Sequence, residues 1–379
     1  MIDFKRVPSP CFLLDERLLA RNLSVVDRVR RESGAEVIVA LKACAMWSIF
    51  PLLARHSDGA TASSAAEARL VREEFGQPAH TYAPVYTDRN IGEILDCSSH
   101  ITFNSLGQFR RFGAMALLRG ISCGLRVNPR YSPVETDLYN PCVAGSRLGV
   151  TAEELEAQGG LPDGIEGLHF HSLCESDSHA LAKVLDAFEQ QFGKYLRQVK
   201  WVNMGGGHLM TREGYDVNHL IQLLKDFKSR YPWLEVIMEP GSAFTWQTGD
   251  LVTSVVDVVE NQGVKTAIID ASFACHMPDC LEMPYQPAIA ESCEEATDTI
   301  AYRLGGNSCL SGDYVGDWYF RKPLTTGDRL TLKDMNHYTT VKTTMFNGIQ
   351  HPAIVFCDKT GECSYLRRFD YNDYKTRMS

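Results

Sequence analysis

The chain has 379 residues, with 38 basic and 47 acidic side chains, a formal charge of −9 and 44% hydrophobic residues. This composition predicts a folded protein of two domains, or one barrel with insertions, and excludes wholesale disorder. An acidic chain without a basic cluster favours cationic small molecules over nucleic acid as partners. No apolar run approaches the roughly 20 residues of a membrane span, and the first six residues lack an apolar leader. We therefore expect no membrane segment and a cytoplasmic protein whose twelve cysteines are thiols.

Eight short apolar segments recur in the first two thirds of the chain, each bounded by polar or turn residues. They are Glu36–Leu41, Gly59–Ser63, Thr81–Val85, Ile101–Phe103, Gly124–Val127, Gly167–Phe170, Trp201–Met204 and Glu235–Met238. Helical patterns separate most of them; Thr151 and Glu154 predict a capping box, and Ala180–Val199 has one apolar stripe. Eight strands alternating with helices predict a (β/α)₈ barrel like that of triosephosphate isomerase.

The pattern changes after about Ala243, where β-branched segments alternate with Gly, Pro and Asn turns. These segments are Leu251–Val259, Val264–Ile269, Leu330–Leu332 and Ala353–Phe356. They predict a C-terminal all-β domain, a sandwich or barrel, and the early segment Cys11–Leu14 is expected to pair into it. The predicted organisation is an N-terminal strand in 1–15, an α/β barrel in 16–243 and a β domain in 244–379.

The predicted strands carry polar or glycine residues at their C-terminal ends, where barrel enzymes place their reactive side chains. These residues are Lys42, Arg126 with Asn128, His169 with His171, Gly205, Gly206 and Gly207, and Glu239. We expect His171 to face the site and His169, taken as an alternate position, to face away.

Three of these features together match pyridoxal 5′-phosphate. A buried lysine has a lowered pKa and reacts with an aldehyde, three glycines expose N–H groups to a phosphate, and Glu239 suits a ring nitrogen. Taken singly, Lys42 could be a rim lysine and the glycines a flexible turn. The Cys275–Cys280 segment has no second cysteine cluster to complete a metal site, so we expect no metal.

Further motifs carry a resemblance to a known family. They are Gly124–Pro129, Ser146–Gly149, Gly167–His171, Glu239–Gly241, Cys309 with Asp313, and Tyr338 followed by Phe346–Gly348. In this order they resemble the pyridoxal-phosphate-dependent basic amino acid decarboxylases of the alanine racemase and ornithine decarboxylase fold. The resemblance runs from about Pro8 to Phe356.

The resemblance implies roles for individual residues. Lys42 would bind the cofactor covalently, His171 would stack on it, and Glu239 would meet the ring nitrogen. The phosphate contacts would be Gly205, Gly206, Gly207, Gly241 and Tyr338. Cys309 and Asp313 would come from the other subunit of a homodimer with shared active sites, and Cys309 would be catalytic. Arg126 and Arg147 remain open between cofactor contacts and scaffold ion pairs.

Three segments within the resemblance indicate a carboxylated polyamine as the substrate: His169–Glu175, Ala274–Asp279 and Gly305–Cys309. Leu310 stands where relatives acting on ornithine or diaminopimelate usually have an acid, and Ser242 where they often have arginine. These departures weaken the case for ornithine, lysine and diaminopimelate. The nearest alternative is a decarboxylase of the same fold with another substrate, such as carboxyspermidine, diaminopimelate or arginine. Candidate substrate contacts are Asp279, Glu282, Glu175, Asp313 and Ser242. A non-catalytic binding protein, a racemase or a sugar-phosphate barrel enzyme are the rival interpretations.

Overall fold

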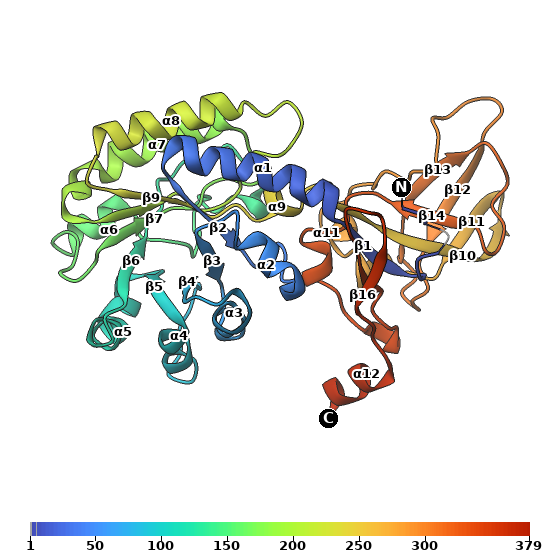
Figure 1. The fold of residues 1–379 in the computed structure, drawn as a ribbon, viewed down its shortest axis with the longest axis horizontal. Helices are drawn as coiled ribbons and strands as arrows, with labels where there is room; N and C mark the ends of the chain where they lie inside the picture. The colour runs from blue at the N-terminus through green and yellow to red at the C-terminus, as the bar shows by residue number, and fades with distance from the viewer. Residues whose placement is uncertain (1, 5) are drawn as a thin grey trace. The chain divides into compact units, whose positions relative to one another are not determined.

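A closed barrel of eight parallel strands forms one of the two units into which the chain divides. The computed structural model describes residues 2–4 and 6–379. One unit is Asn22–Phe244, and the other comprises the described residues up to Arg21 together with Thr245–Ser379 (Figure 1). The barrel strands are β2 (Glu36–Ala40), β3 (Gly59–Ala62), β4 (Ala79–Tyr82), β5 (Ser98–Phe103), β6 (Ser122–Arg126), β7 (Gly167–His169), β8 (Trp201–Asn203) and β9 (Glu235–Met238). They close in chain order, so the predicted barrel is confirmed.

Helices surround the barrel strands (Figure 1). They are α1 (Glu16–Ser33), α2 (Phe50–Leu53), α3 (Ala65–Leu70), α4 (Ile91–Cys97), α5 (Leu106–Leu118), α6 (Ala152–Ala157), α7 (Ser178–Phe192), α8 (Val217–Arg230) and α9 (Ser242–Thr245). The Thr151 capping box is present. The helix predicted to reach Val199 ends at Phe192, since a 3₁₀ segment takes over at Gly193. In the described part of the chain, no helix is long and apolar enough to cross a membrane.

The barrel interior is filled near the N-terminal ends of its strands by Trp201. Its indole N–H donates to Ser122 Oγ at 2.9 Å, and its ring occupies the space that side chains on neighbouring strands would need. A Cβ atom at Gly167 would lie 2.0 Å from this ring, and one at Gly124 would lie 2.2 Å from it. Because this end is packed with side chains, an interior pocket has room only toward the opposite ends of the strands.

The second unit is a branched, mostly antiparallel sheet of eight strands. Its main path is β13-β12-β11-β10-β1-β15-β16, and β14 also pairs with β10. The strands are β1 (Cys11–Asp15), β10 (Gly249–Asn261), β11 (Val264–Ile269), β12 (Ile300–Gly305), β13 (Tyr314–Phe320), β14 (Arg329–Leu332), β15 (Ala353–Cys357) and β16 (Cys363–Arg367). Three short helices accompany them: α10 (Phe273–His276), α11 (Asp279–Glu282) and α12 (Tyr371–Met378).

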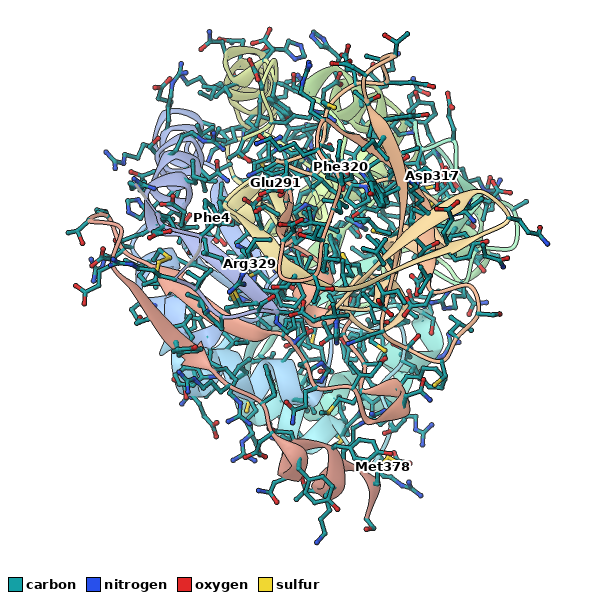
Figure 2. All side chains as sticks on the ribbon, turned by 90° about the vertical axis from the view of Figure 1, so that its right-hand side faces the viewer. Phe4, Glu291, Asp317, Phe320, Arg329 and Met378 are labelled. Atoms are coloured by element: carbon teal, nitrogen blue, oxygen red, sulfur yellow. A yellow bond between two sulfur atoms is a disulfide. The ribbon has the colours of Figure 1, made fainter. Side chains whose placement is uncertain are left out.

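The N-terminal strand β1 lies in the middle of this sheet, antiparallel to β10 and parallel to β15. Phe12 on β1 belongs to a core that also contains Leu251, Trp318 and Phe320. Figure 2 looks onto this unit, with Phe320 and Arg329 marking β13 and β14. The Arg329 guanidinium donates to the carbonyl of Val7 at 3.1 Å and thereby attaches the N-terminal segment to the sheet.

Three strands of the second unit were not predicted from the sequence: β12, β13 and β16. In β13, exposed residues alternate irregularly with buried ones, and the central Gly316-Asp317 pair is typical of a turn. The strand exists because it pairs antiparallel with its neighbour β12, with one shift of register between Arg303 and Gly305. The local sequence pattern does not show which other strand will pair with a segment.

One pair of cysteines departs from the expectation that all twelve are thiols. Cys357 on β15 and Cys363 on β16 form a disulfide. The two residues are directly paired in the β15–β16 register, with Cα atoms 4.0 Å apart. The hairpin therefore brings the two side chains together, a proximity that their separation of six residues did not reveal.

Candidate active site

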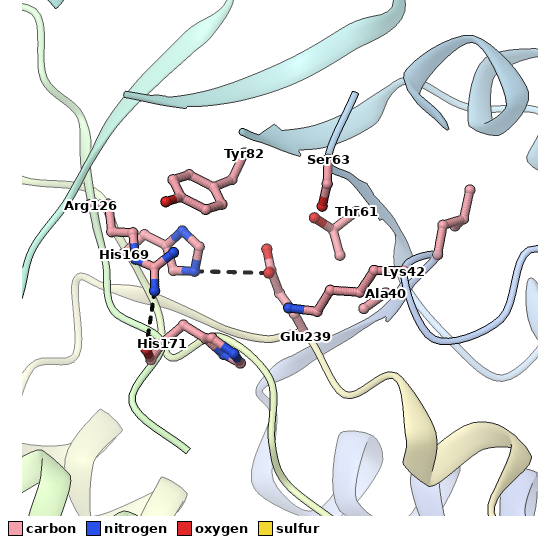
Figure 3. A pocket seen from close by; sticks show the side chains of 10 residues that line it. Ala40, Lys42, Thr61, Ser63, Tyr82, Arg126, His169, His171 and Glu239 are labelled. Carbon is pink, nitrogen blue, oxygen red and sulfur yellow. Dashed lines mark hydrogen bonds and ion pairs between the residues drawn. The ribbon is translucent and has the colours of Figure 1, made fainter. Parts of the chain in front are cut away.

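A polar pocket lies at the C-terminal ends of the barrel strands, where the sequence predicted it (Figure 3). Its lining residues are Ala40, Leu41, Lys42, Thr61, Ser63, Tyr82, Arg126, His169, His171 and Glu239. They come from β2, β3, β4, β6, β7 and β9 or from the residues that follow these strands. The closed barrel thus converts residues spread over about half of the chain into one cluster.

Glu239 is the buried carboxyl group of this pocket. It follows β9 directly and is only 6% exposed. Asn203 Nδ2 donates to Glu239 Oε1 at 2.6 Å, and Asn203 Oδ1 in turn accepts the Gly205 N–H at 2.9 Å. Burial raises the pKa of Glu239, while Lys42 and the hydrogen bonds from Asn203 and Thr61 oppose that shift. The hydrogen bond from Asn203 therefore fixes the direction of the carboxyl group.

Lys42 places its amine in the same pocket, two residues beyond the end of β2. Figure 3 shows the side chain extending toward Glu239. Burial lowers the pKa of Lys42, and the charges of Glu239 and Glu67 oppose the shift only in part. Glu67 is itself held by the Ser63 N–H, which it accepts at 2.6 Å. A lysine in this setting supplies more neutral amine, the form that attacks an aldehyde, than a solvated lysine does.

Both histidines of the β7 motif face the pocket, so the expectation that His169 faces away was wrong. Residues two apart on a strand point to the same side, and it is Phe170 between them that is directed into the surrounding core. His169 Nε2 lies 3.8 Å from Glu239 Oε2. Burial lowers the pKa of both His169 and His171 well below the usual range, which keeps the two rings neutral.

The ring of His171 is oriented by the glycine triplet. Its Nδ1 accepts the N–H of Gly206 at 2.8 Å, so the ring proton of the neutral imidazole resides on Nε2. Gly206 is thus committed to His171, and the Gly205 N–H to Asn203. Two of the three N–H groups that were expected to face an anion are used within the protein.

The glycines also permit a close backbone approach. Gly207 has a φ of +87°, and a Cβ atom there would lie 2.2 Å from the carbonyl oxygen of Leu173. Gly241 lies equally close to the turn that carries Lys42, since its Cβ would lie 2.6 Å from Ala43 Cβ. The loops around the pocket therefore pack against one another at distances that only glycine allows.

Arg126 is held inside the pocket by neutral groups. Its guanidinium donates to the His171 carbonyl at 3.2 Å and lies 4.6 Å from the Tyr82 ring centre. Within residues 2–4 and 6–379 it forms no ion pair with a carboxylate, so the scaffold ion-pair interpretation does not apply. Arg147 is exposed, and its carbonyl accepts a hydrogen bond from Asn104 Nδ2 at 2.8 Å.

Four polar residues of the site escaped the sequence analysis: Thr61, Ser63, Tyr82 and Asn203. Thr61, Ser63 and Asn203 lie at or near the C-terminal end of a predicted strand, so the rule that identified Lys42 and Glu239 would have selected them. Tyr82 would have been missed, because the expected strand Thr81–Val85 placed it near the start, whereas β4 ends at Tyr82.

Two predicted acids of the second unit already have a partner. Asp279 and Glu282 on α11 both form ion pairs with Lys342. All three side chains are partly exposed, with fractions of 23%, 49% and 33% respectively. Burial would lower the pKa of Lys342, but the hydrogen bonds and charges of these acids outweigh it and raise the pKa. A ligand ammonium group reaching these acids would have to share them with Lys342.

The other predicted residues are placed in different environments. Cys309 is exposed, whereas Asp313 is only 4% exposed and accepts four hydrogen bonds. Because a carboxylate offers about four acceptor positions, these bonds leave Asp313 poorly suited to the expected substrate contact. Tyr338 is half-buried, with a φ of +47°. In the barrel unit, Glu175 is exposed and Ser242 begins α9.

The pocket residues fit pyridoxal phosphate by their chemistry. An amine of lowered pKa, a buried carboxyl group held by Asn203, and a neutral imidazole of fixed orientation line the same cavity. These are a partner for the aldehyde, a partner for the ring nitrogen and a flat surface for the ring.

Residues 12–336 match the sequence family described as "Pyridoxal-dependent decarboxylase, C-terminal sheet domain". The match spans both units, and the chain belongs to this family.

Within it, the chain is similar to proteins named for carboxylated polyamines. It is 51% identical to a carboxyaminopropylagmatine decarboxylase of Synechocystis sp., over 98% of this chain and 96% of that protein. It is 41% identical to a carboxynorspermidine/carboxyspermidine decarboxylase of Campylobacter jejuni, over 99% of both chains. The crystal structure of a Campylobacter jejuni carboxynorspermidine decarboxylase complexed with norspermidine superposes with a TM-score of 0.90 at 39% identity, covering 98% of this chain and 100% of that one.

The position of Lys42 predicts where the cofactor becomes attached. After incubation with pyridoxal 5′-phosphate and reduction with borohydride, peptide mass mapping should find the pyridoxyl group on Lys42. The buried amine has the lowered pKa that the reaction needs. Lys42→Ala should lose the covalent cofactor and nearly all turnover, whereas Lys194→Ala, at an exposed ion pair of the same unit, should retain both. A label on a different lysine contradicts the assignment.

Proposed function

We propose that this chain uses pyridoxal 5′-phosphate to decarboxylate a carboxylated polyamine in the cytoplasm. The expected reactions are carboxynorspermidine to norspermidine and carboxyspermidine to spermidine. The observation that carries the proposal is the similarity over full length to the Campylobacter jejuni relative, with an amine, a carboxyl group and two imidazoles in one pocket. The exposed, uncharged Leu310 beside Cys309 argues against diaminopimelate as the substrate, because it cannot form an ion pair with a substrate ammonium group.

When bound, the cofactor supplies an electron sink for the pair left behind as CO₂ departs. The residues of the chain prepare that chemistry. Lys42 would bind the aldehyde group, Glu239 as a carboxylate would hold the ring nitrogen in its protonated form, and His171 would contact the ring. The Asn203 hydrogen bond keeps the Glu239 carboxyl group pointed into the pocket. Gly207, Gly241 and Tyr338 are the proposed phosphate contacts.

The neutral charge of the two histidines also favours binding of the cofactor ring nitrogen by Glu239. His169 and His171 are kept uncharged by burial and by the nearby positive charges of Lys42 and Arg126. Two extra positive charges would compete with the protonated ring nitrogen for Glu239. Neutral imidazoles leave that carboxyl group to the cofactor. The proton that completes the reaction would come from Lys42 Nζ or from Cys309 Sγ.

The distal amines of a polyamine need negatively charged partners, and we propose Asp279 and Glu282 for them. The two acids bind the primary ammonium of Lys342 in this structure, which supports their suitability for such a group. Because these side chains are partly exposed, the ion pairs contribute little stability and exchange readily.

A second candidate substrate is carboxyaminopropylagmatine. The relative named for it shares 51% identity with this chain, more than the 41% of the Campylobacter jejuni protein. Its agmatine part ends in a guanidinium group instead of an ammonium group. Both ends are cationic, so the acids on α11 could accept either.

One assay distinguishes these substrates. The purified holoenzyme should be given carboxynorspermidine, carboxyspermidine, carboxyaminopropylagmatine, diaminopimelate, ornithine and arginine separately, and kcat/KM measured from CO₂ and amine release. We expect the two carboxylated triamines to give the highest values. Faster turnover of carboxyaminopropylagmatine would identify that compound as the preferred substrate in place of the two triamines. Preference for a simple amino acid would reject the proposed substrate class.

Glu239→Gln tests the proposed partner of the ring nitrogen. Glutamine keeps the shape and can still accept the Asn203 hydrogen bond, but it lacks the negative charge that would keep the ring nitrogen protonated, so the electron sink weakens. We expect kcat to fall by roughly two orders of magnitude or more. Absorbance spectra should show that the variant still contains cofactor. Normal kcat at normal cofactor content would refute the role.

We also propose that the enzyme is a homodimer whose sites combine Lys42 of one subunit with Cys309 of the other. A two-fold axis produces two equivalent sites of this kind. Mixing equal amounts of Lys42→Ala and Cys309→Ala proteins should restore about a quarter of wild-type activity. Half of the dimers are then mixed, and each mixed dimer has one complete site of two. If demonstrated subunit exchange restores no activity, the sites are not shared.

A further inference from the structure

The loop that carries Cys309 connects β12 to β13 and is anchored at both ends. The Gly306 N–H donates to the Asp313 carbonyl at 2.7 Å, and the Asp313 N–H donates to the Leu310 carbonyl at 3.0 Å. Cys309 lies exposed at the tip of this loop. An exposed tip needs additional contacts if its thiol is to point in one direction.

Asp313 fixes the base of the loop. Its carboxylate accepts Ser308 Oγ at 2.6 Å and Ser272 Oγ at 2.8 Å, and it also accepts the N–H groups of Ser308 and Ala274. Ser272 and Ala274 lie at the start of α10. The buried carboxylate therefore ties the Cys309 loop to a second segment of the same unit.

Asn347 fixes the tip. Its Oδ1 accepts the backbone N–H of Cys309 at 2.8 Å. Asn347 has a φ of +59°, in the left-handed region that asparagine tolerates better than most residues. The same segment is joined to α10, because the Thr344 N–H donates to the Cys275 carbonyl at 2.8 Å. Three segments, 272–276, 305–313 and 344–348, thus form one hydrogen-bonded cluster with Cys309 at its surface.

We infer that Asn347 is a positioning residue that sets the direction of Cys309 through this hydrogen bond. The inference rests on the proposed function, in which Cys309 takes part in the reaction. It gives a role to Asn347 of the Phe346–Gly348 motif, which the sequence analysis singled out. The position requires an acceptor oxygen and a left-handed backbone together, a combination that asparagine and aspartate provide.

Two substitutions separate these requirements. Asn347→Gly accepts the positive φ without strain but lacks the acceptor, whereas Asn347→Asp keeps both. In the full-length holoenzyme, we expect kcat to fall about fivefold to tenfold in Asn347→Gly, the effect of one lost hydrogen bond. Asn347→Asp should stay within about twofold of wild type. Equal kcat in all three proteins, or equal losses in both variants, would overturn the inference.

A double-mutant cycle tests whether Asn347 acts through Cys309. Asn347→Gly should cause no further loss of kcat when Cys309 is already alanine, because the group it orients is absent. A residue that only stabilises the sheet would reduce kcat by the same factor in both backgrounds. That result would reject the positioning role.

The rate of Cys309 alkylation reports the environment of the Cys309 thiol and does not require catalytic turnover. Iodoacetamide should label Cys309 of Asn347→Gly at least threefold faster or slower than in wild type, relative to the exposed Cys174 of the barrel unit, measured by peptide mass mapping. An unchanged ratio contradicts the inference. This measurement needs no substrate, so it tests the positioning role independently of the proposed function. The proposed function is rejected by a different result, namely that the wild-type enzyme decarboxylates none of the polyamines.

Discussion

Burial of an acid and an amine in the same barrel interior is the constraint from which the site properties follow. Charged groups are costly in a low-dielectric environment, so burial raises the pKa of Glu239 and lowers that of Lys42. The hydrogen bond from Asn203 Nδ2 to Glu239 Oε1, at 2.6 Å, stabilises the buried carboxyl group. The same burial keeps His169 and His171 neutral. The raised pKa of Glu239 and the lowered pKa values of Lys42, His169 and His171 therefore have one common physical cause, which is burial.

The glycines around this pocket contribute through packing as much as through their N–H groups. The Gly205 N–H donates to Asn203, which holds the Glu239 carboxyl group, and the Gly206 N–H donates to the His171 imidazole. Gly207 lets two loops approach within a distance that a side chain would prevent. The three glycines thus position the residues that line the pocket. Any phosphate contact would be in addition to that structural role.

In the sheet unit, hydrogen bonds connect residues that lie far apart along the chain. The Asp313 carboxylate joins the Cys309 loop to α10, and Asn347 joins the same loop to the 344–348 segment. The α11 acids Asp279 and Glu282 are paired with Lys342 at the surface. A buried carboxylate with four donors is rigid, whereas an exposed ion pair is exchangeable, so the first suits positioning and the second suits ligand binding.

The eight-stranded barrel, most strands of the sheet and the main pocket residues could be predicted from the amino-acid sequence, because strand periodicity and strand ends are local features. Lys42, Arg126, His171 and Glu239 all line the pocket as predicted. The inward orientation of His169 follows from the same periodicity, since it lies two residues from His171. The folded chain was needed to show that the Gly206 N–H binds His171, that Lys342 pairs with the α11 acids and that four donors bind the Asp313 carboxylate. Each of these depends on which distant segments the folded chain brings within about 3 Å, a hydrogen-bonding distance that residue spacing cannot specify.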